Sequence, residues 1–200
     1  MPWDGHSVVP LLVVDELSHL SEVLHTLVAE GMSIVEIGLR TTVALDAIAL
    51  ASDVPGLTVG AGTVLDVDSA KAALEAGASF GVSPSSHPEI MGWALDHEWP
   101  YIPGIATPTE AHLALDAGFH NLKVYPAARL GGVEFIEALW AVFPTLRFMP
   151  SGGVSHSNAQ EYLDHPGVFA VSGSWLTPRT AVNTGDLGAL KKAFSGWRTG

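Results

Sequence analysis

The sequence contains no cysteine, which excludes a disulfide framework, a thiolate metal site and a cysteine nucleophile. It is also poor in basic residues, because 9 Lys and Arg stand against 21 Asp and Glu, for a formal net charge of -12. This balance argues against a protein that coats nucleic acid or anionic lipid, whereas a few placed cations or backbone amides still suffice for a small anion. No run reaches the ~18 uncharged apolar residues of a membrane span, and the beginning of the chain lacks a basic segment followed by a long apolar one. We therefore expect a cytoplasmic protein with no membrane and no nucleic-acid partner.

Apolar residues are abundant and regularly grouped. They make up 48% of the 200 residues, while charged residues make up 15%, so the chain can bury a core and disorder is excluded as its main state. Short β-rich apolar runs recur at intervals of roughly twenty to twenty-five residues, the length of a repeating unit of strand, loop, helix and loop. The eight runs begin at Val8, Ser33, Leu57, Phe80, Tyr101, Asn121, Leu146 and Val168.

Amphipathic segments lie between these runs. Residues 17–30 carry apolar side chains at helical spacing, and the Ala- and Leu-rich segments 68–76 and 109–117 also predict helices. A glycine follows each segment, at Gly31, Gly77 and Gly118, as is typical of a helix C-terminus. Buried strands that alternate with helices indicate a parallel sheet covered by helices, and eight units favour closure into a single (β/α)8 TIM barrel domain spanning residues 1–200. An open doubly wound sheet is the alternative.

The working face of such a barrel is formed by the carboxyl ends of its strands and the loops that follow them. The polar residues expected there are Glu36, Arg40, Thr63, Ser83, Thr107, Lys123, Arg129, the segment Ser151-Gly152-Gly153 and the segment Ser172-Gly173-Ser174.

Lys123 is the most unusual of these residues. It lies inside a predicted strand whose alternation points Lys123 and Tyr125 to one side, which we expect to be the barrel lumen. Burying an ammonium group costs several kcal/mol unless the group is paired or gives up its proton, so we interpret Lys123 as a nucleophile. The alternative is a lysine paired with Glu36 for stability alone. Replacing Lys123 by alanine is expected to abolish catalysis and leave the fold mostly intact.

Glu36 and Arg40 surround the end of the second predicted strand. Glu36 interrupts an apolar run, where a desolvated carboxyl group can pass protons, or it merely neutralises Arg40 or Lys123. The planar guanidinium of Arg40 suits a carboxylate ligand, and the alternative is a surface arginine at the start of a helix.

Two small-residue segments follow the seventh and eighth strands. Backbone N–H groups of Ser151-Gly152-Gly153 and of Ser172-Gly173-Ser174 could converge with the following helix N-termini into a phosphate cradle, although each segment alone is equally a tight turn. The Gly60-Ala-Gly62 segment lacks the third glycine of a dinucleotide fingerprint. The 9 histidines form neither His-x-His nor His-Glu-x-x-His, so we expect no metal and no cofactor.

Several motifs, in order along the chain, resemble those of one enzyme family, the 2-keto-3-deoxy-6-phosphogluconate aldolases, also described as 4-hydroxy-2-oxoglutarate aldolases. These motifs are Gly38-Leu-Arg-Thr41, Val59-Gly-Ala-Gly-Thr-Val-Leu65, Val82-Ser-Pro84, Ile102-Pro-Gly-Ile105, Leu122-Lys-Val-Tyr-Pro-Ala127, Pro150-Ser-Gly-Gly153 and Gly173-Ser-Trp-Leu176.

The resemblance implies a homotrimeric class I aldolase that needs no metal and cleaves a six-carbon keto acid phosphate to pyruvate and glyceraldehyde 3-phosphate. It implies that Lys123 forms the Schiff base and that Glu36 shuttles protons. The remaining roles it implies are Arg40 and Thr63 on the pyruvate carboxylate, Ser83, Pro84, Tyr125 and Ser151 lining the substrate pocket, and Gly152, Gly153, Gly173 and Ser174 on the phosphate.

The chain departs from the family pattern after the lysine motif, where Ala128-Arg129-Leu130 precedes a glycine pair, and at Ser151, which replaces a common threonine. Arg129 either binds a phosphate or a second carboxylate, or it points into solvent. The function that the resemblance implies extends to cleavage of 4-hydroxy-2-oxoglutarate to pyruvate and glyoxylate. The alternative functions are the same chemistry on a galactonate-type or an unphosphorylated keto acid, a phosphate-binding isomerase or synthase without a Schiff base, and a non-catalytic sugar-phosphate sensor.

Overall fold

The computed structural model describes residues 1–195 and residue 197. All eight apolar runs form parallel strands, and the fifth run is divided in two by Pro103, which has no N–H group to donate to a neighbouring strand. The strands are β1 (Val8–Leu12), β2 (Ile34–Gly38), β3 (Thr58–Gly62), β4 (Phe80–Val82), β5 (Tyr101–Ile102), β6 (Gly104–Ile105), β7 (Asn121–Val124), β8 (Arg147–Pro150) and β9 (Val171–Gly173).

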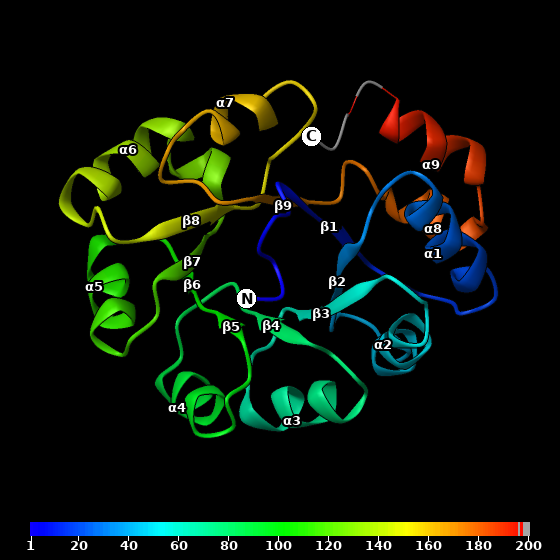
Figure 1. Cartoon of the computed structure of the whole chain (residues 1–200), viewed down its shortest axis with the longest axis horizontal. Coiled ribbons are helices and arrows are strands. Elements are labelled where there is room, and N and C mark those ends of the chain that lie inside the picture. The colour runs from blue at the N-terminus through cyan, green and yellow to red at the C-terminus, as the bar shows by residue number, and fades with distance from the viewer. Residues whose placement is uncertain (196, 198–200) are drawn as a thin grey trace.

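The strands make two curved parallel sheets. One has the order β5-β4-β3-β2-β1-β9, and the other has the order β6-β7-β8. The divided fifth run connects them at one side. At the other side, Phe148 pairs with Val168 and Ser151 pairs with Ser172 in isolated parallel bridges. The fold is therefore an α/β fold whose parallel strands curl around a common centre (Figure 1).

Helices cover the outside of the strands (Figure 1). They are α1 (Leu20–Ala29), α2 (Ala44–Ser52), α3 (Val67–Glu75), α4 (Pro88–Asp96), α5 (Pro108–Asp116), η1 (Ala127–Leu130, a 3-10 helix), α6 (Val133–Val142), α7 (Ala159–Leu163), α8 (Arg179–Thr184) and α9 (Leu187–Phe194). The helices α1, α3 and α5 confirm the three helices predicted from the sequence, with bounds shifted by one to three residues. Gly31, Gly77 and Gly118 all have positive φ at the ends of these helices, as a C-terminal glycine requires.

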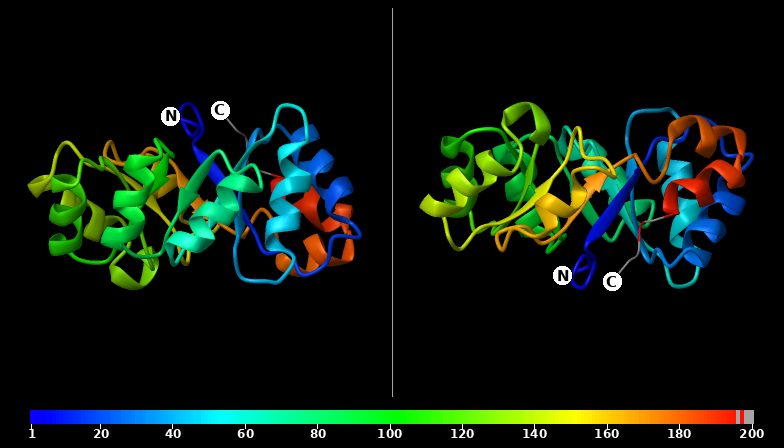
Figure 2. Two further views of the ribbon diagram at one scale, coloured as in Figure 1. Left: turned by 90° about the horizontal axis from the view of Figure 1, so that it is seen from below. Right: turned by 90° about the horizontal axis from the view of Figure 1, so that it is seen from above.

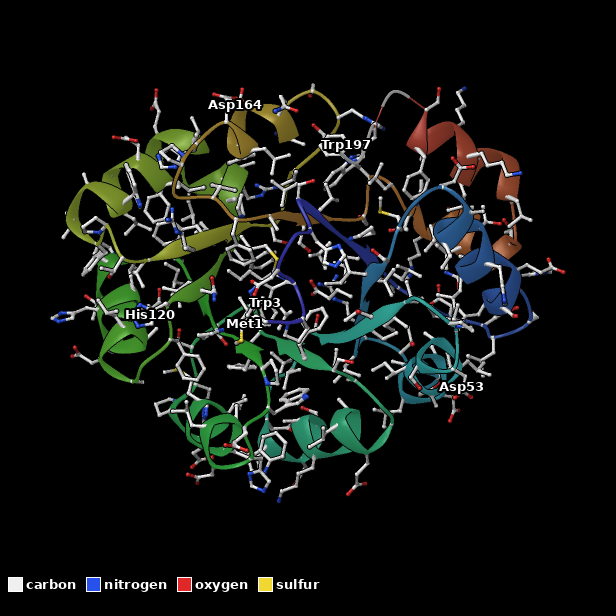
Figure 3. The ribbon with its side chains drawn as sticks, in the orientation of Figure 1. Met1, Trp3, Asp53, His120, Asp164 and Trp197 are labelled. Carbon is white, nitrogen blue, oxygen red and sulfur yellow. The ribbon has the colours of Figure 1, made fainter. Side chains whose placement is uncertain are left out.

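The apolar interior has two parts. The larger part lies between the strands and the helices, and the smaller part fills the space enclosed by the strands. In this inner cluster Trp3 is 2% exposed and packs edge-on against Phe80 and close to Phe169. Phe80 begins β4 and Phe169 precedes β9, so Trp3 closes the enclosed space at the amino ends of the strands. Figure 3 shows Trp3 at the centre of the ring, and Figure 2 shows the N-terminal segment at one face of it.

The carboxyl ends of the strands are consequently the open end of the enclosed space.

Among the described residues, no helix is both long and apolar enough to cross a membrane.

Candidate active site

Lys123 and Glu36 meet inside the ring of strands. Lys123 lies on β7 and Glu36 on β2, 87 residues earlier in the chain, and Lys123 Nζ donates a hydrogen bond to Glu36 Oε1 at 3.2 Å. The lysine side chain is 4% exposed and the glutamate side chain 0%. A buried ion pair within hydrogen-bonding distance can transfer a proton without the participation of bulk water. The alternation along the strand, which predicted an inward-pointing lysine, is confirmed by this burial.

Gly62 provides the space that Glu36 occupies. Residues 36 and 60 are paired across β2 and β3, which places Gly62 beside the carboxylate. A Cβ atom at position 62 would lie 2.2 Å from Glu36 Oε1 and 2.7 Å from its Cγ. The Gly60-Ala-Gly62 segment therefore belongs to the site for a steric reason, which the sequence pattern alone did not indicate.

Arg40 and Thr63 are brought together by the loops after β2 and β3. Arg40 Nε donates a hydrogen bond to Thr63 Oγ1 at 2.9 Å. Thr63 has a φ of 60°, an unfavourable left-handed conformation for a β-branched residue that is typically retained at functional sites. Within the described part of the chain, the two terminal nitrogens of Arg40 have no hydrogen-bond partner, so the guanidinium can receive a carboxylate.

A pocket of about 180 Å³ opens beside these groups. Tyr125 lines it, is 37% exposed, and has its ring centroid 6.0 Å from Lys123 Nζ, so the pocket is adjacent to the buried amine. The pocket is lined by Leu11, Arg40, Tyr125, Ser151, Gly152, Gly153, Val154, Gly173 and Ser174. The structure thus gathers the predicted carboxylate-binding arginine and both small-residue segments around one opening.

The two small-residue segments present backbone N–H groups to this pocket. Gly152, Gly153 and Ser174 donate no backbone hydrogen bond to any other described residue. Gly152 and Gly153 have φ values of +84°, and the 3-10 helix η1 holds their loop, because its Ala127 and Ala128 N–H groups donate to the carbonyls of Ser151 and Gly152. The sequence led us to expect a helix N-terminus directly after each of the two small-residue segments, but in the structure no helix begins directly after either segment.

The segment after Gly153 makes a turn before α7 begins at Ala159. The Asn158 side chain stabilises that turn, since it accepts a hydrogen bond from Ser155 N and donates one to Gly153 O. Residues 175–178 similarly separate Ser174 from α8, which begins at Arg179. An anion in this pocket would therefore be bound by loop amides, and the helix N-termini would contribute little.

Some of the predicted site residues do not line the pocket. Ser83 is fully buried, and its hydroxyl donates to the carbonyl of Val64 at 2.6 Å, so it ties β4 to the loop after β3. Pro84 lies against Gly104, which is paired with Lys123 on the adjacent strand. Thr107, in the same ring of polar residues, caps α5 by accepting a hydrogen bond from Glu110 N.

Arg129 is exposed on η1 and lies outside the set of residues that line the pocket. Ser172, in contrast, is closer to the reactive pair than its sequence context indicated. Its hydroxyl donates to Glu36 Oε2 at 3.0 Å, and Ser172 is fully buried. Inward alternation along β9 was the only sequence signal for this contact.

Comparison with known proteins agrees with this geometry. Residues 4–193 match the family model described as "KDPG and KHG aldolase", where KDPG is 2-keto-3-deoxy-6-phosphogluconate and KHG is 4-hydroxy-2-oxoglutarate. The chain is 40% identical over 186 residues to the KHG/KDPG aldolase of Escherichia coli (strain K12), covering 92% of this chain and 87% of the relative. It is 35% identical over 191 residues to the 2-dehydro-3-deoxy-phosphogluconate aldolase of Zymomonas mobilis, covering 96% and 92%.

A solved structure is similarly close. The KDPG aldolase from Legionella pneumophila, determined with pyruvate captured at low pH as a covalent carbinolamine intermediate, superposes with a TM-score of 0.92 at 33% identity, covering 96% of this chain and 94% of the other. The order of motifs along the sequence, the fold and these matches lead to one conclusion: the chain belongs to the KDPG and KHG aldolase family.

Proposed function

We propose that this chain is a class I aldolase that cleaves 2-keto-3-deoxy-6-phosphogluconate to pyruvate and glyceraldehyde 3-phosphate, and 4-hydroxy-2-oxoglutarate to pyruvate and glyoxylate. The observation that carries the proposal is the buried contact of 3.2 Å between Lys123 Nζ and Glu36 Oε1, next to a pocket lined by Arg40, whose two terminal nitrogens have no hydrogen-bond partner among the described residues. The covalent pyruvate adduct named for the Legionella relative supports the same chemistry. The proposed cleavage requires no metal and no cofactor.

The reaction begins at Lys123. Its ammonium group passes a proton to Glu36, and the neutral amine attacks the C2 ketone of the substrate. Glu36 returns this proton to the hydroxyl of the carbinolamine, which leaves as water, so that a protonated iminium forms and Glu36 is again a carboxylate. The iminium withdraws electrons from C3. Glu36, directly or through one water, then takes the proton of the C4 hydroxyl, and the C3–C4 bond breaks as the aldehyde leaves. The electron pair of that bond forms an enamine, which is protonated at C3, and hydrolysis releases pyruvate and the free amine.

The two ends of the substrate have separate binding groups in this proposal. Arg40, held by its bond to Thr63, receives the pyruvate carboxylate with its two terminal nitrogens. The backbone N–H groups of Gly152, Gly153 and Ser174 receive the phosphate, beside Gly173. Tyr125 flanks the iminium and Ser151 lines the pocket beside it, whereas Ser83 and Pro84 act from behind the pocket, where they hold the loops after β3 and β4.

Reductive trapping tests the proposal. Incubation with pyruvate and borohydride should reduce the imine and leave a carboxyethyl group on Lys123, which peptide mass spectrometry would locate. A protein that takes up no adduct, or takes it up at Lys71, Lys191 or Lys192, would refute the Schiff-base mechanism and leave the isomerase or synthase alternative.

The ratio of kcat/KM for phosphorylated and unphosphorylated keto acids decides the substrate class, because loop amides that bind phosphate should favour the phosphorylated one.

Adding a methyl group at Gly62 should disable the enzyme. In Gly62→Ala the new Cβ overlaps Glu36 Oε1, so the carboxylate must move away from Lys123. A displacement of ~1 Å in a catalytic group can cost about 100-fold in rate, and we expect kcat to fall by that order. Steady-state pyruvate release measures the effect.

Gly92→Ala is the matched control for this substitution. Gly92 lies in the interior of α4, and a Cβ atom there meets nothing within 4 Å. This variant should keep full activity and gain about 0.5–1 kcal/mol in the free energy of unfolding, because alanine replaces glycine inside a helix. Equal activity of both variants would show that Glu36 tolerates displacement and is not the proton carrier.

We also propose that residues 1–200 act as one domain whose two sheets close into a (β/α)8 barrel, and that the protein is a cytoplasmic homotrimer. The bridges between β8 and the segment of β9 support closure. Apolar side chains on the outer helices support assembly, since Leu95, Leu113 and Val142 are 50%, 60% and 68% exposed. Light scattering in solution would measure the assembly.

A further inference from the structure

The two oxygens of the Glu36 carboxylate have different partners. Oε1 accepts from Lys123 Nζ on β7, and Oε2 accepts from Ser172 Oγ on β9 at 3.0 Å. The strands β2, β7 and β9 lie at three separate places around the ring (Figure 1). The carboxylate is therefore held from two sides by residues far from it in sequence, and all three side chains are almost fully buried.

The position of Ser172 follows from the pairing of its strand. Ser172 lies opposite Val9 of β1 and bridges to Ser151 after β8. Alternation places it on the same inward face as Ala170, which belongs to the enclosed apolar cluster. Its neighbours Gly173 and Ser174 line the pocket, whereas Ser172 is absent from that lining. The hydroxyl thus serves the carboxylate and not the phosphate.

The contact with Lys123 becomes a weaker hold on Glu36 during the reaction. Once the amine forms a carbinolamine and then an iminium, its nitrogen is bonded to the substrate and has fewer N–H groups to donate. The terminal torsion of a glutamate side chain is soft, so a carboxylate with one partner can rotate. Gly62 limits the space on one side of the carboxylate but donates no hydrogen bond. Within the part of the chain that the structure describes, Ser172 is the other donor to this carboxylate and keeps its hydroxyl while Lys123 is bonded to the substrate.

We propose that Ser172 is a positioning residue for Glu36, which keeps Oε1 directed at the reacting atoms while Lys123 is covalently bound to the substrate. This inference rests on the proposed aldolase function and goes further by assigning the orientation of its proton carrier. The role predicts a selective defect: steps in which Glu36 moves a proton to or from carbon-bound intermediates slow down, while binding and imine formation do not.

The experiment compares two measurements on Ser172→Ala. Exchange of the pyruvate methyl protons with deuterated solvent reports proton transfer at the enamine, and borohydride trapping reports the fraction of Lys123 able to form the imine. We expect exchange per trapped lysine and kcat to fall about 10- to 100-fold, with KM changed less than about twofold and trapping retained. Ser172→Cys provides a second variant, because cysteine keeps most of the side-chain volume and a weak S–H donor. Its exchange rate per trapped lysine should lie between that of the unmodified protein and that of Ser172→Ala.

Thr177→Val is the matched control. Thr177 is also fully buried in the segment after β9, and its hydroxyl donates to the backbone carbonyl of Leu11 at 2.8 Å and not to the Glu36 carboxylate. Thr177→Val should lower the free energy of unfolding about as much as Ser172→Ala does, and its exchange rate per trapped lysine should equal that of the unmodified protein. An unchanged exchange rate per trapped lysine in Ser172→Ala, or an equal loss in Thr177→Val, would overturn the inference. Absence of trapping in the unmodified protein would instead refute the aldolase proposal itself.

Discussion

Replacing Lys123 by methionine is expected to lower the rate of cleavage by at least about 10⁴-fold, because no other described side chain in the site carries an amine that can form the iminium. Methionine nearly fills the space of the lysine stem, so the loss reports the amine and not a cavity. Pyruvate release under saturating substrate measures the rate, and borohydride trapping should detect no adduct. Activity within tenfold of the unmodified protein would contradict the assignment of Lys123 as nucleophile.

The same substitution should also affect stability. The sequence alone predicts that removing this amine leaves the fold mostly intact, but the structure shows that it would leave the Glu36 carboxylate buried with Ser172 as its remaining partner. Breaking a buried ion pair in this way costs about 3–5 kcal/mol unless the remaining group takes up a proton. We therefore expect a measurable loss in urea denaturation.

A double variant separates the two effects. Lys123→Met combined with Glu36→Gln removes both charges and should recover most of the lost stability while remaining inactive. If the double variant were as unstable as Lys123→Met alone, packing of the lysine stem and not the unpaired carboxylate would be the cause.

Replacing Glu36 by glutamine is expected to lower kcat by about 10²- to 10⁴-fold, the usual contribution of a general acid or base. Glutamine keeps the size of the side chain and a carbonyl oxygen that can accept the hydrogen bond from Ser172, but it cannot take a proton from the C4 hydroxyl. The imine should still form with pyruvate, though more slowly. Borohydride trapping should therefore reach completion, and methyl-proton exchange should be nearly lost.

Glu75→Gln is the control for this charge change. Glu75 is exposed at the end of α3, so its substitution should leave activity unchanged. If Glu36→Gln exchanged pyruvate protons at the unmodified rate, a group other than Glu36 would have to carry the proton. If it failed to trap pyruvate at all, the essential role of Glu36 would be to accept the first proton from Lys123.

Local sequence patterns were sufficient to predict the strands, the ends of three helices and the direction of Lys123, because neighbouring residues in the sequence determine these features. The spacing of the apolar runs predicted all the strands, because a buried parallel strand shows itself by continuous apolar residues. Alternation within the sixth run predicted that Lys123 points inward, and the glycines after three helices marked their ends. The division of the fifth strand at Pro103 could also have been predicted from the sequence, since proline has no N–H group to donate to a neighbouring strand.

The site required contacts that no local pattern contains. The partners of Glu36 come from residues 87 and 136 positions further along the chain. Their meeting depends on how the strands curl and in which register they pair, and Ser172 consequently looked like part of a phosphate loop until its strand was placed. The space at Gly62 and the closure of the enclosed space by Trp3, at the amino ends of the strands, also depend on how the strands curl and pair.

The sequence by itself determined the repeating units, the unusual lysine and the family. Only the tertiary structure decided which oxygen of Glu36 faces which donor, and that the two glycine segments share one pocket with Arg40. The physical reason is that periodicity sets which face of a strand a side chain occupies, whereas the distance between two such faces is set by the packing of the whole ring.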